Sequence, residues 1–315
     1  MSHIFDALQR SEAESARNEI APARSSGYPP ATELLQAAER KMQLLAAAAG
    51  VVSGSPANGT AANGNGRHDH ATAYPSELDE FPTLPVSILP SSRLVSVGAE
   101  ESLGAEKFRF LAVKLRQLRQ SRTLKKVLIT STIPQEGKST VAANLACTLA
   151  RRKQHKTLLL EGDLRRPAVA EKFGLGRLPG LCEWLSGKTE NISIYRLESL
   201  GLWILPAGSA PQNPLELMQS GKLPSLMEQL EVWFDWIVID SPPVLPLADA
   251  SIWSRMADGI LLVTRRGITE KQQLQRGLEA IERSKLLGAL VNSSSNVAHS
   301  DYYQRYSSPP ADRTK

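Results

Sequence analysis

The sequence predicts an α/β protein in which a mostly parallel sheet lies between two layers of helices. Short apolar runs alternate with helical patterns from about residue 93 onward. Continuous apolar strands separated by helices are typical of a parallel sheet that is buried on both faces. Ligands of such folds bind at the carboxyl ends of the strands, so we expect the chemistry of this protein there.

The predicted elements follow one another regularly along the chain. A helix is expected at 105–120, "AEKFRFLAVKLRQLRQ", before the first strand. Leucine-rich or β-branched runs predict six strands, at 126–132, 156–163, 202–208, 236–242, 259–265 and 288–294. Helical patterns lie between most of them, the clearest at 138–152 and 269–285.

The N-terminal part differs in composition from the rest of the chain. Short helices are predicted at 1–16 and 31–48, followed by a Gly/Asn/Ala/Ser-rich stretch that buries too little apolar surface to order itself. We therefore predict a largely disordered extension at 1–92, a catalytic domain at 93–297 and a flexible tail at 298–315.

Composition favours a cytoplasmic protein. No run approaches the roughly 18 apolar residues needed to cross a bilayer, and the N-terminus lacks the pattern of a secretory signal. The two cysteines, Cys147 and Cys182, form neither a disulfide framework nor a metal-ligand spacing. The net charge of +5 is compatible with phosphate-containing ligands without identifying one.

The first predicted strand leads into "STIPQEGKST", residues 131–140, which resembles a phosphate-binding loop. Gly137 allows close approach of the backbone, Lys138 is placed to reach the β- and γ-phosphates, and Ser139 to bind Mg²⁺. Thr132 stands where the general pattern has its first glycine. The predicted nucleotide-binding residues of the loop are Pro134, Gln135, Glu136, Gly137, Lys138, Ser139 and Thr140.

Acidic residues follow two of the other strands. Glu161, Asp163 and Arg165 follow the second strand in "LLLEGDLRRP", and Asp240 ends the fourth in "IVIDSPP". Carboxylates at strand ends beside a phosphate loop can ligate Mg²⁺ and accept a hydroxyl proton. The fold expected is therefore a P-loop NTPase sandwich with a deviant Walker A loop.

These segments together resemble the bacterial tyrosine kinases, the autokinases of capsule and exopolysaccharide biosynthesis. "PQEGKST", "LLLEGDLRRP" and "WIVIDSPPVLP" are similar to that family's Walker A, A′ and B motifs. "LPAGSAPQNPLELM" at 205–218 resembles a further family segment, and the likeness covers roughly 93–306. The start "MSHIFDALQRSE" is similar to openings in a subset without its own transmembrane region.

The resemblance implies roles for individual residues, with ATP and Mg²⁺ as cofactors. Lys138 binds phosphate; Ser139, Asp163 and Asp240 form the Mg²⁺ site. Asp163 or Glu161 accepts the phenol proton, and Arg165 is the arginine of the A′ motif. The resemblance also implies that Asn292 lies near the adenine and that Tyr302, Tyr303 and Tyr306 are the autophosphorylated residues.

The resemblance further implies partners. A separate membrane-anchored co-polymerase or chain-length regulator is the expected activator, and it places the protein at the inner face of the membrane. A homo-oligomer would serve phosphorylation between chains. That expectation is weakened because the oligomerisation motif E-x-x-R-x-x-R reads Glu106, Arg109 and Ala112.

Two further departures from the family pattern concern the site itself. Glu161 replaces the first aspartate of D-x-D-x-R, which leaves the identity of the base open, and Gln135 replaces a common glycine. A catalytically weak ATP-binding scaffold of polysaccharide export therefore stays open as an alternative. So does a partition or cell-division-site ATPase, although Ile133 stands where those proteins carry a signature lysine. The basic stretch 114–126 is interpreted as a solvated helix face, and no nucleic-acid partner is expected.

Overall fold

The computed structural model describes residues 78, 80–152, 154–246 and 248–292. The helices predicted at 1–16 and 31–48, the linker after them and the tail with its tyrosines lie outside these residues. Their structure therefore stays a prediction, as do the boundaries of the three predicted regions.

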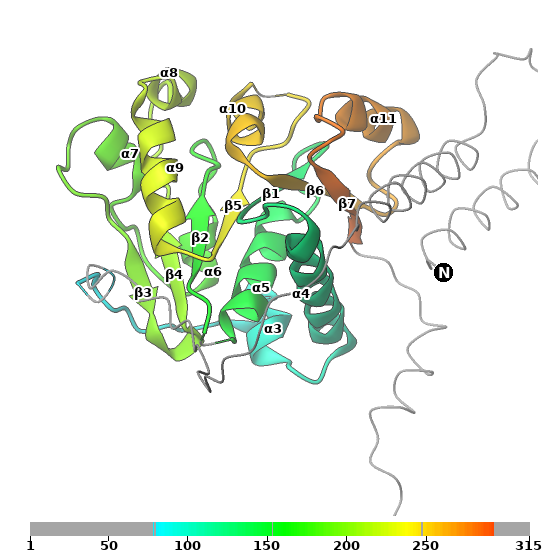
Figure 1. The fold of residues 1–315 in the computed structure, drawn as a ribbon, viewed down its shortest axis with the longest axis horizontal. Helices are drawn as coiled ribbons and strands as arrows, with labels where there is room; N and C mark the ends of the chain where they lie inside the picture. The colour runs from blue at the N-terminus through cyan, green and yellow to red at the C-terminus, as the bar shows by residue number, and fades with distance from the viewer. Residues whose placement is uncertain (1–77, 79, 153, 247, 293–315) are drawn as a thin grey trace, which may run out of the picture. The chain divides into compact units, whose positions relative to one another are not determined.

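A seven-stranded sheet forms the centre of the described domain (Figure 1), in the order β3-β4-β2-β5-β1-β6-β7. All pairs are parallel except β3 with β4. The strands are β1 (Lys126–Ser131), β2 (Thr157–Glu161), β3 (Tyr195–Leu197), β4 (Leu202–Leu205), β5 (Trp236–Asp240), β6 (Gly259–Arg265) and β7 (Leu286–Asn292).

The predicted fold class is confirmed, and all six predicted strands are present. β3 was not predicted, because three residues at the edge of a sheet are too few to show a periodic pattern. The helix expected at 269–285 ends at Glu279 as α11 (Lys271–Glu279). The chain turns there because Leu286 must pair with Ile260 at the start of β7.

Alternate residues of the strands pack into two separate hydrophobic cores, one on each face of the sheet. On one face Leu128, Leu160 and Ile239 pack against α7 (Leu181–Leu185), α9 (Lys222–Trp233) and α10 (Asp249–Met256). The other face holds the buried residues of α5 (Lys138–Ala150) and of α4 (Leu103–Ser121). The remaining helices are η2 (Pro90–Ser92), α3 (Val95–Gly98), α6 (Val169–Lys172), η3 (Glu198–Leu200) and α8 (Pro214–Met218).

The segment before residue 93 also contacts the domain. Leu78 is buried in the core on the α9 face, and Thr83 forms a parallel bridge with Arg196 of β3. The Ser87 N–H donates to the Phe173 carbonyl, just after α6. The edge of the sheet at β3 is thereby covered by the chain that leads into the domain.

Several basic residues of 114–126 bind within the domain, contrary to the expectation of a solvated face. Arg119 donates to the Asp235 carbonyl and stacks over Trp236, while Arg122 donates to the Asp258 carbonyl. Lys126 forms ion pairs with Glu231 and Asp258. These contacts fasten the amino-terminal edge of the sheet, opposite the strand ends that carry the predicted site.

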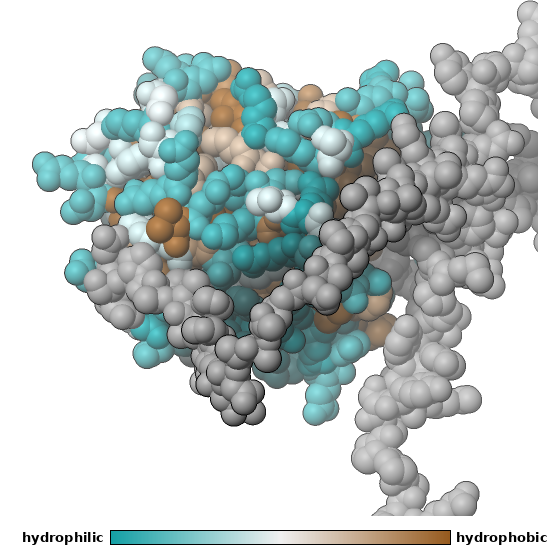
Figure 2. All heavy atoms as spheres, viewed as in Figure 1, coloured by the Kyte–Doolittle hydropathy of each residue, from teal (hydrophilic) through white to brown (hydrophobic). Residues whose placement is uncertain are grey.

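The surface of the face in Figure 2 is mostly hydrophilic, with small groups of hydrophobic residues between the polar ones. Among the described residues, no helix is both long enough and apolar enough to span a membrane.

Candidate active site

The phosphate loop connects β1 to α5 and has the backbone conformation that binding of phosphate requires. Gly137 is the N-cap of α5 with φ of 93°, and Gln135 also has a positive φ of 67°. The first N–H groups of a helix lack acceptors within the helix, and they attract anions. Gln135 thus adopts the left-handed conformation, which a glycine would take without strain.

The loop is held from the side of β6 and β7. The Asn292 amide donates to the Glu136 carbonyl at 2.9 Å, and a Cβ on Gly137 would lie 2.2 Å from Asn292 Nδ2. The buried Glu136 carboxylate accepts from the Ile133 N–H at 2.9 Å and from the Thr269 hydroxyl. Asn292, expected near the adenine, lies against the loop backbone, and the contribution of Thr269 was not predicted.

Lys138 and Asp163 meet at the centre of the site. Lys138 is the first residue of α5, and its Nζ lies 2.9 Å from Asp163 Oδ2; the Asp163 side chain is only 4% exposed. The other Asp163 oxygen accepts from the Arg166 N–H at 3.1 Å. A loop lysine and an A′ aspartate from two separate strand ends are therefore in direct contact. Ser139 and Thr140 follow on the same half-buried first turn of α5.

Asp240 is the buried acid of the site. It ends β5, is 1% exposed, and neither of its carboxylate oxygens has a hydrogen-bond partner in the described part of the chain. Burial raises the pKa of Asp240 to about 7, although the Lys138 charge and the nearby Ser139 side chain act in the opposite direction.

This carboxylate fits a divalent cation. Mg²⁺ takes oxygen ligands and is usually held by one or two carboxylates together with water and substrate phosphates. Among the described residues, no group of three or more His, Cys, Asp or Glu could hold a metal ion by itself. Ser139, Asp163 and Asp240 remain the predicted Mg²⁺ residues.

Glu161, the other candidate base, is fully engaged with the backbone. One of its oxygens accepts from the N–H groups of Ala168 and Val169, and the other from the Ala207 N–H at 3.0 Å. Burial raises the pKa of Glu161, while these three hydrogen bonds oppose the shift. The glutamate at this position therefore ties the A′ segment to the loop after β4, and Asp163 is the carboxylate left facing Lys138.

Arg165 is bound by an acid that the sequence did not point to. Its Nε and Nη2 donate to the two oxygens of Asp249, at 2.7 and 3.1 Å. Asp249 is the first residue of α10, where an aspartate is ordinarily explained as an acid at a helix N-terminus. No pattern in the sequence indicates that the Asp249 side chain instead binds Arg165.

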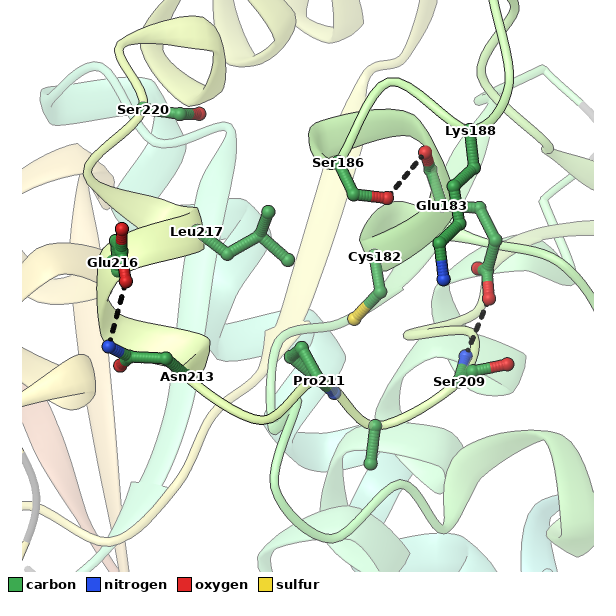
Figure 3. A pocket seen from close by; sticks show the side chains of 11 residues that line it. Cys182, Glu183, Ser186, Lys188, Ser209, Pro211, Asn213, Glu216, Leu217 and Ser220 are labelled. Atoms are coloured by element: carbon green, nitrogen blue, oxygen red, sulfur yellow. Dashed lines mark hydrogen bonds between the residues drawn. The ribbon is translucent and has the colours of Figure 1, made fainter.

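A cavity of about 360 Å³ lies beside this region, between α7, α8 and the loop after β4 (Figure 3). Glu183 accepts from the N–H groups of Gly180 and Ser209, and the Asn213 amide donates to Glu216. The lining includes Cys182 but none of the predicted site residues. Cys182, which lines the cavity, donates its N–H to the Ala207 carbonyl, and the Ala207 N–H in turn donates to Glu161.

A parallel sheet between helices, a phosphate loop and strand-end carboxylates define a P-loop nucleotide-binding protein. Comparisons with known proteins narrow this class. The chain is 36% identical over 212 residues to the tyrosine-protein kinase YwqD of Bacillus subtilis, covering 66% of this chain and 89% of the relative. It is 33% identical over 207 residues to the putative tyrosine-protein kinase CapB of Staphylococcus aureus, covering 64% and 90%. The chain belongs to the family of bacterial tyrosine kinases.

Solved structures agree with this assignment, although no family model matches the chain. The chimerical protein CapA2B2 has a TM-score of 0.60 and 31% identity, covering 68% of this chain and 95% of that one. The kinase domain of the Escherichia coli tyrosine kinase ETK has a TM-score of 0.59 and 26% identity, covering 64% and 82%.

Proposed function

We propose that this protein is an ATP-dependent protein-tyrosine autokinase that phosphorylates Tyr302, Tyr303 and Tyr306 of its tail. The observation that carries the proposal is the contact between Lys138 and Asp163 beside the unpartnered carboxylate of Asp240. One cation and two carboxylates at the mouth of a phosphate loop suit phosphoryl transfer to a hydroxyl group.

The reaction follows from these positions. The phosphates of ATP bind to the N–H groups of the loop and to Lys138, which exchanges Asp163 for phosphate oxygens. The released Asp163 carboxylate accepts the phenol proton of the acceptor tyrosine. The phenol oxygen then bonds to the γ-phosphorus as the bond from that phosphorus to the ADP oxygen breaks. A free tyrosine has a pKa near 10, so a base of this kind is needed at neutral pH.

Ser139 and Asp240 would hold Mg²⁺, with Asp163 close by; the ion, when bound, neutralises charge on the phosphate oxygens. Glu161 is assigned a supporting role, because its oxygens already accept three backbone N–H groups. Arg165 supplies positive charge on the acceptor side of Asp163, and Asn292 borders the nucleotide from the side of β7.

The wider role rests on the family. We infer that the kinase regulates polymerisation and export of a capsular polysaccharide or exopolysaccharide. We further infer that it works at the inner face of the membrane through a separate membrane-anchored co-polymerase. The likeness to the chimerical protein CapA2B2 supports a partner of this kind. An arginine-based oligomer contact at the third motif position is not supported, because Ala112 is fully buried in the core of this domain.

The test is to incubate the purified full chain with ATP and Mg²⁺, with and without a co-expressed co-polymerase, and to map phosphotyrosine by mass spectrometry. We expect phosphate on the three tail tyrosines and none in Lys138→Met. Robust ATP hydrolysis without phosphotyrosine would favour a partition-type ATPase. Nucleotide binding with neither activity would favour a scaffold.

A further inference from the structure

We propose that Asp249 is a positioning residue for the kinase reaction: together with Trp253 it clamps the A′ turn, residues 162–165, that carries Asp163. The inference rests on the proposed function. According to this proposal, α10, the helix after β5, fixes the geometry of the A′ motif.

The first contact of the clamp is the ion pair between Asp249 and Arg165. Both carboxylate oxygens are used, at 2.7 Å to Nε and 3.1 Å to Nη2, which is the strong bidentate geometry of an arginine–carboxylate pair. The Asp249 side chain is 2% exposed, whereas 37% of the Arg165 side chain remains exposed. Truncating the arginine would leave a buried charge without its partner, which is strongly unfavourable.

The second contact lies one helical turn further along α10. Residues four apart share one face of a helix, so Trp253 points to the same side as Asp249. Its indole N–H donates to the Gly162 carbonyl at 3.0 Å. The ring also covers the Gly162 Cα so closely that a Cβ there would lie 2.6 Å from it. Gly162 in turn donates its N–H to the Asp240 carbonyl at 2.7 Å.

Asp163 therefore lies between two anchored residues, Gly162 before it and Arg165 two positions after it. The contacts of its own carboxylate are to Lys138, which must leave when phosphate binds, and to the Arg166 N–H. Once Lys138 turns to the nucleotide, the clamp is what keeps this carboxylate within reach of the acceptor phenol. A displacement of about 1 Å in such a group can cost on the order of 100-fold in rate.

Kinetics of Asp249→Asn separate a positioning role from general stabilisation. The variant keeps the size of the side chain but removes its charge and one acceptor. We expect kcat for tail phosphorylation to fall about 10- to 100-fold, with KM for ATP within about twofold of wild type. Glu228→Gln, the same exchange on an exposed face of α9, is the matched control and should leave both constants unchanged.

A double-mutant cycle tests whether Asp249 acts through Arg165. If it does, Asp249→Asn should add little to the loss already caused by Arg165→Ala, because the interaction it removes is already absent. Fully additive losses, or a kcat of Asp249→Asn equal to that of Glu228→Gln, would overturn the proposal. Should Asp249→Asn fail to fold, Arg165→Lys replaces it, since that change keeps the positive charge but loses the bidentate contact with Asp249.

Hydrogen exchange provides a measurement that does not depend on kinase activity. In Asp249→Asn we expect faster exchange of the amides in 162–169, with unchanged exchange in α5 and in α9. Unchanged exchange in 162–169 would refute the clamp even where activity falls. A wild-type protein that forms no phosphotyrosine would instead refute the proposed function, and the exchange result would still decide whether α10 holds the A′ turn.

Discussion

Asp240 is the residue of the site through which pH acts most directly. Burial raises its pKa from an ordinary value of 3.8 to about 7. Between these values the folded protein holds a proton that the unfolded chain releases. The free energy of unfolding should therefore fall as pH rises from about 4 to 7 by up to about 1.4 kcal/mol per unit, and this contribution should level off above pH 7.

Urea unfolding of the metal-free protein across pH 4.5–8.5 measures this dependence. Asp240→Asn should flatten the profile in that window and should be more stable than wild type at pH 8, where wild type buries a charge. It should bind Mg²⁺ and nucleotide together less tightly. Equal slopes in the two proteins would show that Asp240 does not titrate in this range.

Thr132, just before the phosphate loop, packs closely against Gly277 of α11. Thr132 is fully buried, and a Cβ added to Gly277 would lie 2.9 Å from its Cγ2. Alanine normally stabilises a helix relative to glycine by about 1 kcal/mol. Here we expect Gly277→Ala to destabilise by about 1–3 kcal/mol, because overpacking outweighs propensity.

Thermal unfolding of three variants tests this pair. Adding Thr132→Ala to Gly277→Ala removes the clashing methyl group and should restore much of the lost stability. Thr132→Ala alone is the reference. A Gly277→Ala variant that is more stable than wild type would show that the loop moves aside at little cost.

At the scale of elements, the phosphate loop depends on its contact with the end of β7. Alanine at Gly137 would place Cβ 2.2 Å from Asn292 Nδ2 and would also strain a residue with φ of 93°. Gly221, the N-cap of α9, has φ of 83° with nothing within 4 Å of an added Cβ. Gly221→Ala therefore reproduces the backbone strain without the clash.

We expect Gly137→Ala to lose at least about tenfold in affinity for a fluorescent ATP analogue, while Gly221→Ala stays within about twofold; a loss of 1.4 kcal/mol is a factor of ten. Asn292→Ala combined with Gly137→Ala should regain part of the affinity because the clash is gone. Equal losses in both glycine variants would assign the effect to backbone strain alone.

The elements themselves were largely predictable because each strand is a continuous apolar run, and a sheet buried on both faces demands that pattern. The location of Lys138, Asp163 and Asp240 at the carboxyl ends of the strands was predictable because the loop and strand ends fix the backbone from which they project; their roles stay predictions. The contacts that Asp249, Thr269 and Glu161 make were not predictable. Their contacts are set by the path of loops and by helix rotation, which leave no spacing in the sequence. β3 escaped prediction because its three residues are too few to show a periodic pattern.

At the scale of the whole molecule, the site is assembled from every part of the described sheet except its β3 edge. The side where we propose that the nucleotide binds is supported by β6 and β7 through Thr269 and Asn292, and the proposed acceptor side by β2 and α10 through Glu161 and Asp249. Lys138 and Asp163 lie where these two halves meet. From this arrangement we predict that an acceptor tyrosine enters the site from the side of β2. That side is opposite β7, the strand that precedes the tail.

The tail leaves the described domain at Asn292, four strand spacings from β2 in the order β7-β6-β1-β5-β2, or about 19 Å. Tyr302 lies ten residues beyond Asn292, and ten residues span at most about 35 Å. A tail acting within its own chain would have to cross the strand ends at which we propose that the nucleotide binds. A neighbouring chain has no such obstacle, so we expect phosphoryl transfer between chains.

A mixture of two full-length variants, neither of which can phosphorylate its own tail, tests this expectation. Lys138→Met keeps the acceptor tail without catalysis, whereas the triple change Tyr302→Phe, Tyr303→Phe and Tyr306→Phe keeps the site without acceptors. Phosphate should appear on the Lys138→Met tail in the mixture, and the rate of wild-type autophosphorylation should rise with protein concentration. A wild-type rate independent of concentration, with an unmodified Lys138→Met tail, would mean that the tail does cross its own nucleotide site. The opposite-side entry deduced from Asp163 and Asp249 would then be wrong.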